Sequence, residues 1–205
     1  MKNVLLREFL KVALSIQEIP YSGLRVKDAT LIATDGYSLV AYRTSPLFLR
    51  GEGMLHPLTT QALAVYANAV ISEITVDANT VTFSVCVDYP VSQTCTLPSF
   101  PCEIKYTERI FDKLSDSTTL VEQIATKHIL PANAGKFVKV EGAGLVLATE
   151  EDYPRYDAKR LKQCLTLFRA KDSVTLSVTE EGYLVGADEW GQLFVVSPIV
   201  RRPDW

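Results

Sequence analysis

Apolar positions at the start of the chain follow the period of an amphipathic helix. Within residues 4–18 they recur every three or four positions and share one broad face: Leu5, Leu6, Phe9, Leu10, Ala13 and Ile16. Arg7, Lys11 and Ser15 lie on the opposite face. The helix is expected to end before Pro20, which lacks the backbone N–H that a helix interior needs.

Three strand-like runs follow, at residues 23–26, 30–34 and 37–43. Asp35-Gly36 separates the last two runs. Asp-Gly between strands is a strong hairpin signal, because Gly accepts a positive φ and Asp tolerates it. On spacing alone, the segment 31–41 is a surface hairpin that only turns the chain.

The same order of elements then occurs again. Residues 51–55 predict a strand, and residues 59–70 predict a helix with Thr59 or Thr60 near its N-cap. Strands are predicted at 73–76, 80–85 and 93–97. Such an internal repeat predicts an α+β architecture of antiparallel sheets with helices on one face. Pro98 and Pro101 indicate a linker, so we expect one domain over residues 1–105 and another over 106–205.

The second half of the chain is less regular at its start. Residues 109–114 and 119–129 fit helix or strand equally well, whereas 136–140 and 144–148 predict a hairpin. Residues 157–169 predict an amphipathic helix whose polar face carries Lys159, Lys162, Thr166 and Arg169. Strands at 173–178, 183–187 and 192–196 complete a unit of one helix and three strands.

Composition limits the classes of function. The net charge of −3 gives no global basic field, although a local stripe of Lys and Arg can still bind phosphates. No run is apolar enough for a membrane span, and charges interrupt the N-terminal apolar run, so a cytoplasmic protein is expected. The four cysteines show no metal-binding spacing, and the two histidines lie in no catalytic motif. We therefore expect no cofactor, no metal and no enzymatic activity.

Four segments together resemble the bacterial DNA polymerase III beta sliding clamp, a processivity factor. Residues 33–39, ATDGYSL, resemble the clamp's Ala-Thr-Asp-Gly-His-Arg-Leu segment, and residues 97–101 with Tyr106 resemble the stretch between two clamp domains. Residues 156–168 with the strands after them resemble the last half-domain. Residues 194–201, FVVSPIVR, resemble the clamp's C-terminal Val-Val-Met-Pro-Met-Arg-Leu pattern. The match covers the last two of the family's three domains, so a first domain is expected to be absent.

This resemblance implies a DNA-clamp fold and a role in replication. Clamps are rings of six similar domains, so two domains per chain would need a homotrimer, as in phage-type clamps. The ring would encircle duplex DNA without reading its sequence, tether a DNA polymerase and depend on a clamp loader. The DNA-facing candidates are the cations of the two helical stripes: Arg7, Lys11, Lys159, Lys162 and Arg169. A stripe of this kind is also what an ordinary solvated helix face looks like.

The resemblance also implies a pocket between the two domains that takes a short apolar peptide of the polymerase or another partner. Its walls would be Tyr21, Thr34, Gly36, Tyr37, Ser38 and Leu39; Pro101 and Tyr106; and Val195, Ser197, Pro198 and Ile199. The strand-end residues among them could instead be core. An alternative function is a clamp-like monomeric processivity subunit or interaction module that does not encircle DNA. The acidity of the chain and the uncharged second helix favour that alternative.

Overall fold

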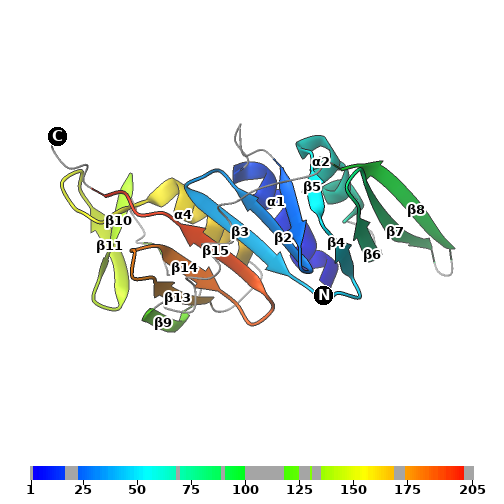
Figure 1. The fold of residues 1–205 in the computed structure, drawn as a ribbon. Helices are drawn as coiled ribbons and strands as arrows, with labels where there is room; N and C mark the ends of the chain where they lie inside the picture. Colours follow the sequence, from blue (N-terminus) through cyan, green and yellow to red (C-terminus); the bar gives the residue numbers. More distant parts are fainter. Residues whose placement is uncertain are drawn as a thin grey trace. The chain divides into compact units, whose positions relative to one another are not determined.

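The computed structural model describes residues 2–16, 23–67, 70–88, 91–99, 118–124, 130, 135–168 and 174–200. Contacts group the chain into two compact units (Figure 1). Unit 1 comprises Met1–Ile104 with Trp190–Gln192, and unit 2 comprises Lys105–Glu189 with Leu193–Trp205.

The first half of unit 1 is one helix packed on a sheet. Helix α1 (Lys2–Ile16) is followed by the antiparallel strands β1 (Leu24–Lys27), β2 (Thr30–Thr34) and β3 (Ser38–Arg43), and it packs against β2 and β3. Its predicted apolar face is buried, and the Phe9 and Tyr42 rings lie 5.9 Å apart. The predicted helix and the Asp-Gly hairpin are both confirmed.

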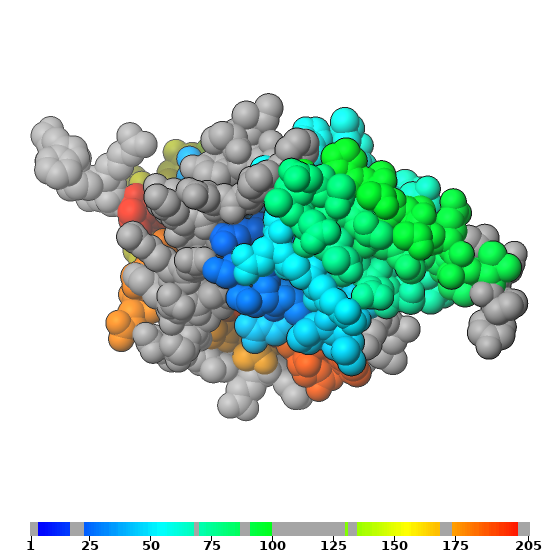
Figure 2. Space-filling model, turned by 45° about the vertical axis from the view of Figure 1, so that its right-hand side comes forward, coloured from blue at the N-terminus to red at the C-terminus, as the bar shows by residue number. Residues whose placement is uncertain are grey.

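The second half of unit 1 repeats this order. It contains β4 (Leu49–Gly51), β5 (Gly53–Leu55), α2 (Pro57–Tyr66), β6 (Val70–Val76), β7 (Thr80–Asp88) and β8 (Val91–Pro98). Strands β4, β6, β7 and β8 form one sheet in that order, whereas β5 pairs with β1 of the other sheet. Helices α1 and α2 pack against each other. Figure 2 shows α1 in blue beside the cyan and green surface of this half.

The single strand predicted at 51–55 is therefore two strands in two sheets. Gly51 has a φ of +84°, and a Cβ there would lie 1.8 Å from the carbonyl oxygen of Val76. Only glycine permits that approach, which lets the chain leave β4 and enter β5 within one residue.

The prediction for α2 was wrong at both ends. The helix begins at Pro57, and the N-cap is His56, whose Nδ1 accepts a hydrogen bond from the Leu58 N–H at 3.2 Å. Proline suits the first helical turn because its missing N–H would have no partner there. Thr59 and Thr60 are buried inside the first turn, and α2 ends at Tyr66.

Unit 2 contains strands of two sheets and a short helix. Its elements are β9 (Thr118–Ile124), β10 (Phe137–Glu141), β11 (Gly144–Ala148), β12 (Tyr156–Asp157), α4 (Ala158–Leu165), the 3-10 turn η3 (Thr166–Phe168), β13 (Val174–Val178), β14 (Leu184–Ala187) and β15 (Gln192–Val196). The strand orders are β15-β14-β13-β9 and β11-β10-β12. The predicted hairpin at 136–148 is confirmed. Of the two undecided segments, 119–129 is a strand as far as Ile124, and 109–114 lies outside the described residues.

The core of unit 2 forms around α4. Asp157 caps the helix by accepting a hydrogen bond from the Arg160 N–H at 3.0 Å, and Leu161 and Cys164 are fully buried beneath it. The hydroxyl of buried Tyr156 donates to the Gly182 carbonyl at 2.7 Å, and burial raises the pKa of this phenol to about 12. The α+β class is confirmed. In the ranges described above, no helix is long and apolar enough to cross a membrane.

Candidate partner and DNA contact surfaces

The turn between β2 and β3 is organised by one buried carboxylate. Oδ1 of Asp35 accepts hydrogen bonds from the Tyr37 N–H at 2.8 Å, the Ser38 N–H at 2.6 Å and the Ser38 hydroxyl at 3.0 Å. Thr34 closes the turn, because its hydroxyl donates to the Ser38 carbonyl and accepts from the Gly36 N–H. Hydrogen bonds from three donors offset the free-energy cost of burying the carboxylate, and they fix the backbone conformation of the turn.

This turn presents one side chain outward. Tyr37 is 62% exposed, whereas Ser38 and Leu39 are buried. Gly36 has a φ of +86°, so any other residue there would strain the backbone. Tyr37 is therefore the side chain that the tip of this turn exposes to solvent.

The C-terminal residues that were predicted to line the peptide pocket belong to unit 2. Val195 is buried, and Ser197, Pro198 and Ile199 are half-buried. The Ile199 N–H donates to the Arg155 carbonyl at 2.7 Å, and the Arg155 N–H donates to the Ile199 carbonyl at 3.2 Å. This two-bond bridge fixes the chain after β15 against the residue that precedes β12.

Sequence reasoning missed the aromatic stack beneath this bridge. The Arg155 guanidinium lies 4.1 Å from the ring centroid of Phe137 and 4.6 Å from that of Tyr153, and Nη1 donates to the Thr149 carbonyl at 3.0 Å. Tyr153 and Arg155 are close in sequence. Phe137 and Thr149 reach the same place only through the β10–β11 hairpin, and no local pattern predicts that meeting.

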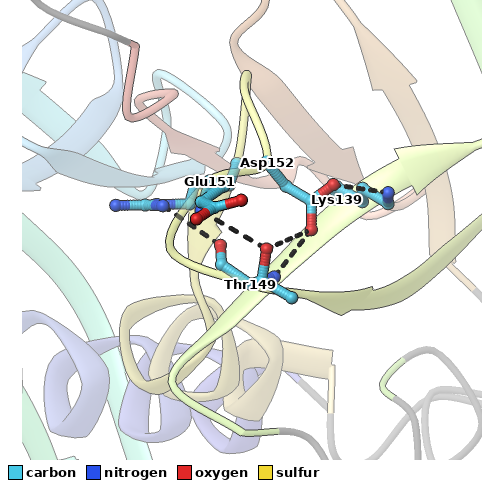
Figure 3. A network of polar contacts seen from close by, with 5 residues as sticks. Lys139, Thr149, Glu151 and Asp152 are labelled. Carbon is cyan, nitrogen blue, oxygen red and sulfur yellow. Dashed lines mark hydrogen bonds and ion pairs between the residues drawn. The ribbon is translucent and has the colours of Figure 1, made fainter.

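A polar network lies beside the stack (Figure 3). Lys139 Nζ lies 2.7 Å from Oδ1 of Asp152, while Oδ2 accepts from the Thr149 N–H at 2.7 Å and from its hydroxyl at 2.9 Å. The hydrogen bond from Lys139, followed by those from Thr149, lowers the pKa of Asp152 to about 2. This loop is thereby held in place by charge-assisted bonds at ordinary pH.

The cations of α1 share one carboxylate. Glu8 Oε1 lies 3.3 Å from Arg7 Nε and 3.0 Å from Lys11 Nζ. The stripe predicted from the sequence is therefore partly neutralised by the acid that flanks it. Surface pairs of this kind contribute little to stability, but they reduce the field that a phosphate would meet.

The cations of α4 are better placed to attract an anion. Lys159 and Lys162 are exposed, and neither forms an ion pair with any residue that the structure describes. They lie three positions apart and therefore face the same side of the helix.

Four predicted site residues lie outside the described residues: Tyr21, Pro101, Tyr106 and Arg169. The expected contact between 34–39 and Pro198-Ile199 would join residues of the two units, and it stays a prediction. Within the described ranges, no group of three or more His, Cys, Asp or Glu side chains could hold a metal ion.

Solved structures with the same fold are DNA polymerase III beta sliding clamps. The Borrelia burgdorferi subunit, in complex with a natural product, is 7% identical over 98% of this chain and 64% of its own, with a TM-score of 0.66. A Pseudomonas aeruginosa clamp with a ligand is 13% identical over 96% of this chain and 64% of its own, at a TM-score of 0.62. The Helicobacter pylori clamp, bound to a DNA ligase peptide, is 12% identical over 96% and 63%, at a TM-score of 0.59.

The chain therefore has the clamp fold, as its sequence resemblance implied, and spans a little under two thirds of the length of these relatives. No protein-family model matches it, and no curated protein matches it by sequence. At this level of identity the likeness establishes the architecture alone.

We expect replacement of Asp35 by alanine to lower the free energy of unfolding by about 1.5–3 kcal/mol, because three donors, two of them in buried hydrogen bonds, lose a charged acceptor. Asp35→Asn keeps an acceptor oxygen and should lose less. Urea unfolding followed by circular dichroism measures both values. An alanine variant as stable as the parent would show that the carboxylate does not organise this turn.

Proposed function

We propose that this protein is a DNA sliding clamp and polymerase processivity factor that closes as a homotrimer around duplex DNA. The observation that supports the proposal most strongly is the clamp fold, which extends over nearly the whole chain. The chain has two units and about two thirds of the length of clamp subunits, so three copies would supply the six domains of a clamp ring. We propose further that this clamp is of the phage type, acts in the cytoplasm and has no enzymatic activity.

Electrostatics supports sequence-independent contact with DNA. Lys159 and Lys162 on α4 form no ion pair within the described ranges and are cations of the kind that neutralise phosphates. Arg7 and Lys11 on α1 contribute a weaker field. A ring that holds DNA topologically needs only modest phosphate contacts, which agrees with a net charge of −3. The partners in this proposal are duplex DNA, a DNA polymerase and a clamp loader.

Ring closure has a direct test in solution mass and in DNA topology. Sedimentation should give a concentration-dependent species of three times the 22.8 kDa chain mass. Once loaded, that species should stay on a closed circular duplex through a high-salt wash and leave after the circle is linearised, because a topological link does not depend on screened charge. A monomer at every concentration would contradict the ring.

Removal of the α4 cations should weaken the hold on DNA without unfolding the chain. We expect Lys159→Ala with Lys162→Ala to shorten retention on linear duplex and to reduce its salt dependence by about two phosphate contacts. The matched control is Arg50→Ala with Lys136→Ala, which removes the same charge from two exposed side chains outside α4. Equal retention by the α4 variant and the parent would contradict the DNA-facing assignment.

The turn at 34–39 supports a partner-binding role through Tyr37. A polymerase tail peptide that docks there should lose at least about tenfold in affinity with Tyr37→Asp, since an exposed aromatic anchor is replaced by a charge. The control is Leu47→Asp, at another exposed apolar position of unit 1. Fluorescence anisotropy measures the affinity. Unchanged binding by Tyr37→Asp would move the peptide site elsewhere.

A second candidate is a clamp-like module that does not encircle DNA. Two observations favour it: the shared carboxylate of Glu8 on α1 and the absence of any charged residue from α2, PLTTQALAVY. Such a module would be monomeric, bind a polymerase through the Tyr37 surface and release circular and linear DNA equally fast.

A further inference from the structure

Glu8 is the only acidic residue within the three helices α1, α2 and α4. It lies among the cations of α1, where Arg7 precedes it and Lys11 follows three positions later. Helix α4 carries Lys159 and Lys162 and contains no acid. The two cationic helices of the proposed DNA surface therefore differ in one carboxylate.

One oxygen of this carboxylate holds both cations of α1. Oε1 of Glu8 accepts hydrogen bonds from Arg7 Nε at 3.3 Å and from Lys11 Nζ at 3.0 Å. Lys11 is at the usual helical spacing for such a pair, whereas neighbouring positions of a helix do not face each other. The Arg7 side chain therefore bends toward Glu8 instead of extending directly into solvent.

The acid is less accessible than the cations that it holds. The Glu8 side chain is 21% exposed, against 36% for Arg7 and 59% for Lys11. Salt screens partly buried charges less than fully exposed ones, so this carboxylate lowers the positive potential of α1 at physiological ionic strength as well. A phosphate that approaches α1 meets two cations whose charge is partly offset.

Sliding along DNA needs phosphate contacts that form and break easily. Each cation that neutralises a phosphate releases a counter-ion, and this release is the main source of sequence-independent affinity for duplex DNA. A surface ion pair is weak, so Glu8 can reduce the contribution of Arg7 and Lys11 to that affinity without abolishing it.

We propose that Glu8 limits the hold of α1 on duplex DNA by competing with phosphates for Arg7 and Lys11. The inference rests on the proposed function and deepens it. Helix α4 supplies the stronger phosphate contact, and α1 supplies a contact that Glu8 keeps weak. Loss of this carboxylate converts α1 into a second strong contact and slows movement along DNA.

Glu8→Gln tests this role, because it removes the charge and keeps the length of the side chain. The measurement is binding of the full chain to a short linear duplex, followed by fluorescence anisotropy over a range of salt concentrations. At low salt, Glu8→Gln should bind at least about threefold more tightly than the parent. Its affinity should also fall more steeply with salt, by up to about two phosphate contacts.

The matched control is Glu73→Gln in β6. It also removes one acid that is paired with an arginine, since Glu73 Oε1 lies 3.5 Å from Arg50 Nη1, and it changes the net charge by the same amount. If the two variants bind the duplex equally, the effect is one of net charge alone and the proposal is overturned. Glu8→Gln that binds no more tightly than the parent overturns it too.

Lys11→Gln measures the same competition from the side of the cation. With Glu8 present this substitution should cost little affinity, because Lys11 is already held, whereas in the Glu8→Gln background it should cost about one phosphate contact. Equal costs in the two backgrounds contradict the competition. If Glu8→Gln fails to fold, Glu8→Asp retracts the carboxylate from Lys11 at constant charge and should give a smaller gain; an unchanged affinity then contradicts the proposal.

The outcome is independent of ring closure, because a short linear duplex has free ends and cannot be retained topologically. A trimer that stays on circular DNA, but in which Glu8→Gln and Glu73→Gln bind the short duplex equally, refutes only the role of Glu8. A chain that never closes a ring and still responds to Glu8→Gln as expected refutes only the encircling function.

Discussion

The architecture of unit 1 depends on one close backbone contact between Gly51 and Val76. Strand β4 pairs with β6 up to Gly51, and the chain then turns within one residue to place β5 beside β1. The second half of unit 1 thereby adds β5 to the sheet of the first half. A side chain at Gly51 would overlap the Val76 carbonyl, so the contact and the positive φ both require glycine.

Much of the fold could be predicted from local patterns. The apolar face of α1 and the Asp35-Gly36 turn are encoded by neighbouring residues, and both were predicted. The division of residues 51–55 into two strands was not predicted. It depends on the close contact of Gly51 with Val76, which lies 25 residues later in the chain, and hydrophobic periodicity carries no information about such a distant contact. The start of α2 did have a local signal in His56-Pro57, which the threonines after it obscured.

The candidate site was less predictable than the fold. Periodicity located the cations of α1 and α4, but it did not show that Glu8 would partly neutralise the first pair. Nor did it show that Lys159 and Lys162 would form no ion pair with the residues that the structure describes. Likewise, the stack at Arg155 combines a strand, a loop and the segment after β15. Sequence patterns identify which face of a helix or strand is polar. The net charge of a surface depends in addition on which charged side chains the fold brings together.

The backbone conformation of the turn that carries Tyr37 is held by hydrogen bonds from the residues on either side of this tip residue. The turn hydrogen bonds described above come from the side chains of Thr34, Asp35 and Ser38 and from backbone groups, and Tyr37 contributes its N–H to them. A substitution at position 37 keeps the hydrogen bond from its N–H to Asp35, because every residue except proline has this group. A lineage with this turn could acquire new partners by single substitutions at its tip, with the hairpin beneath unchanged.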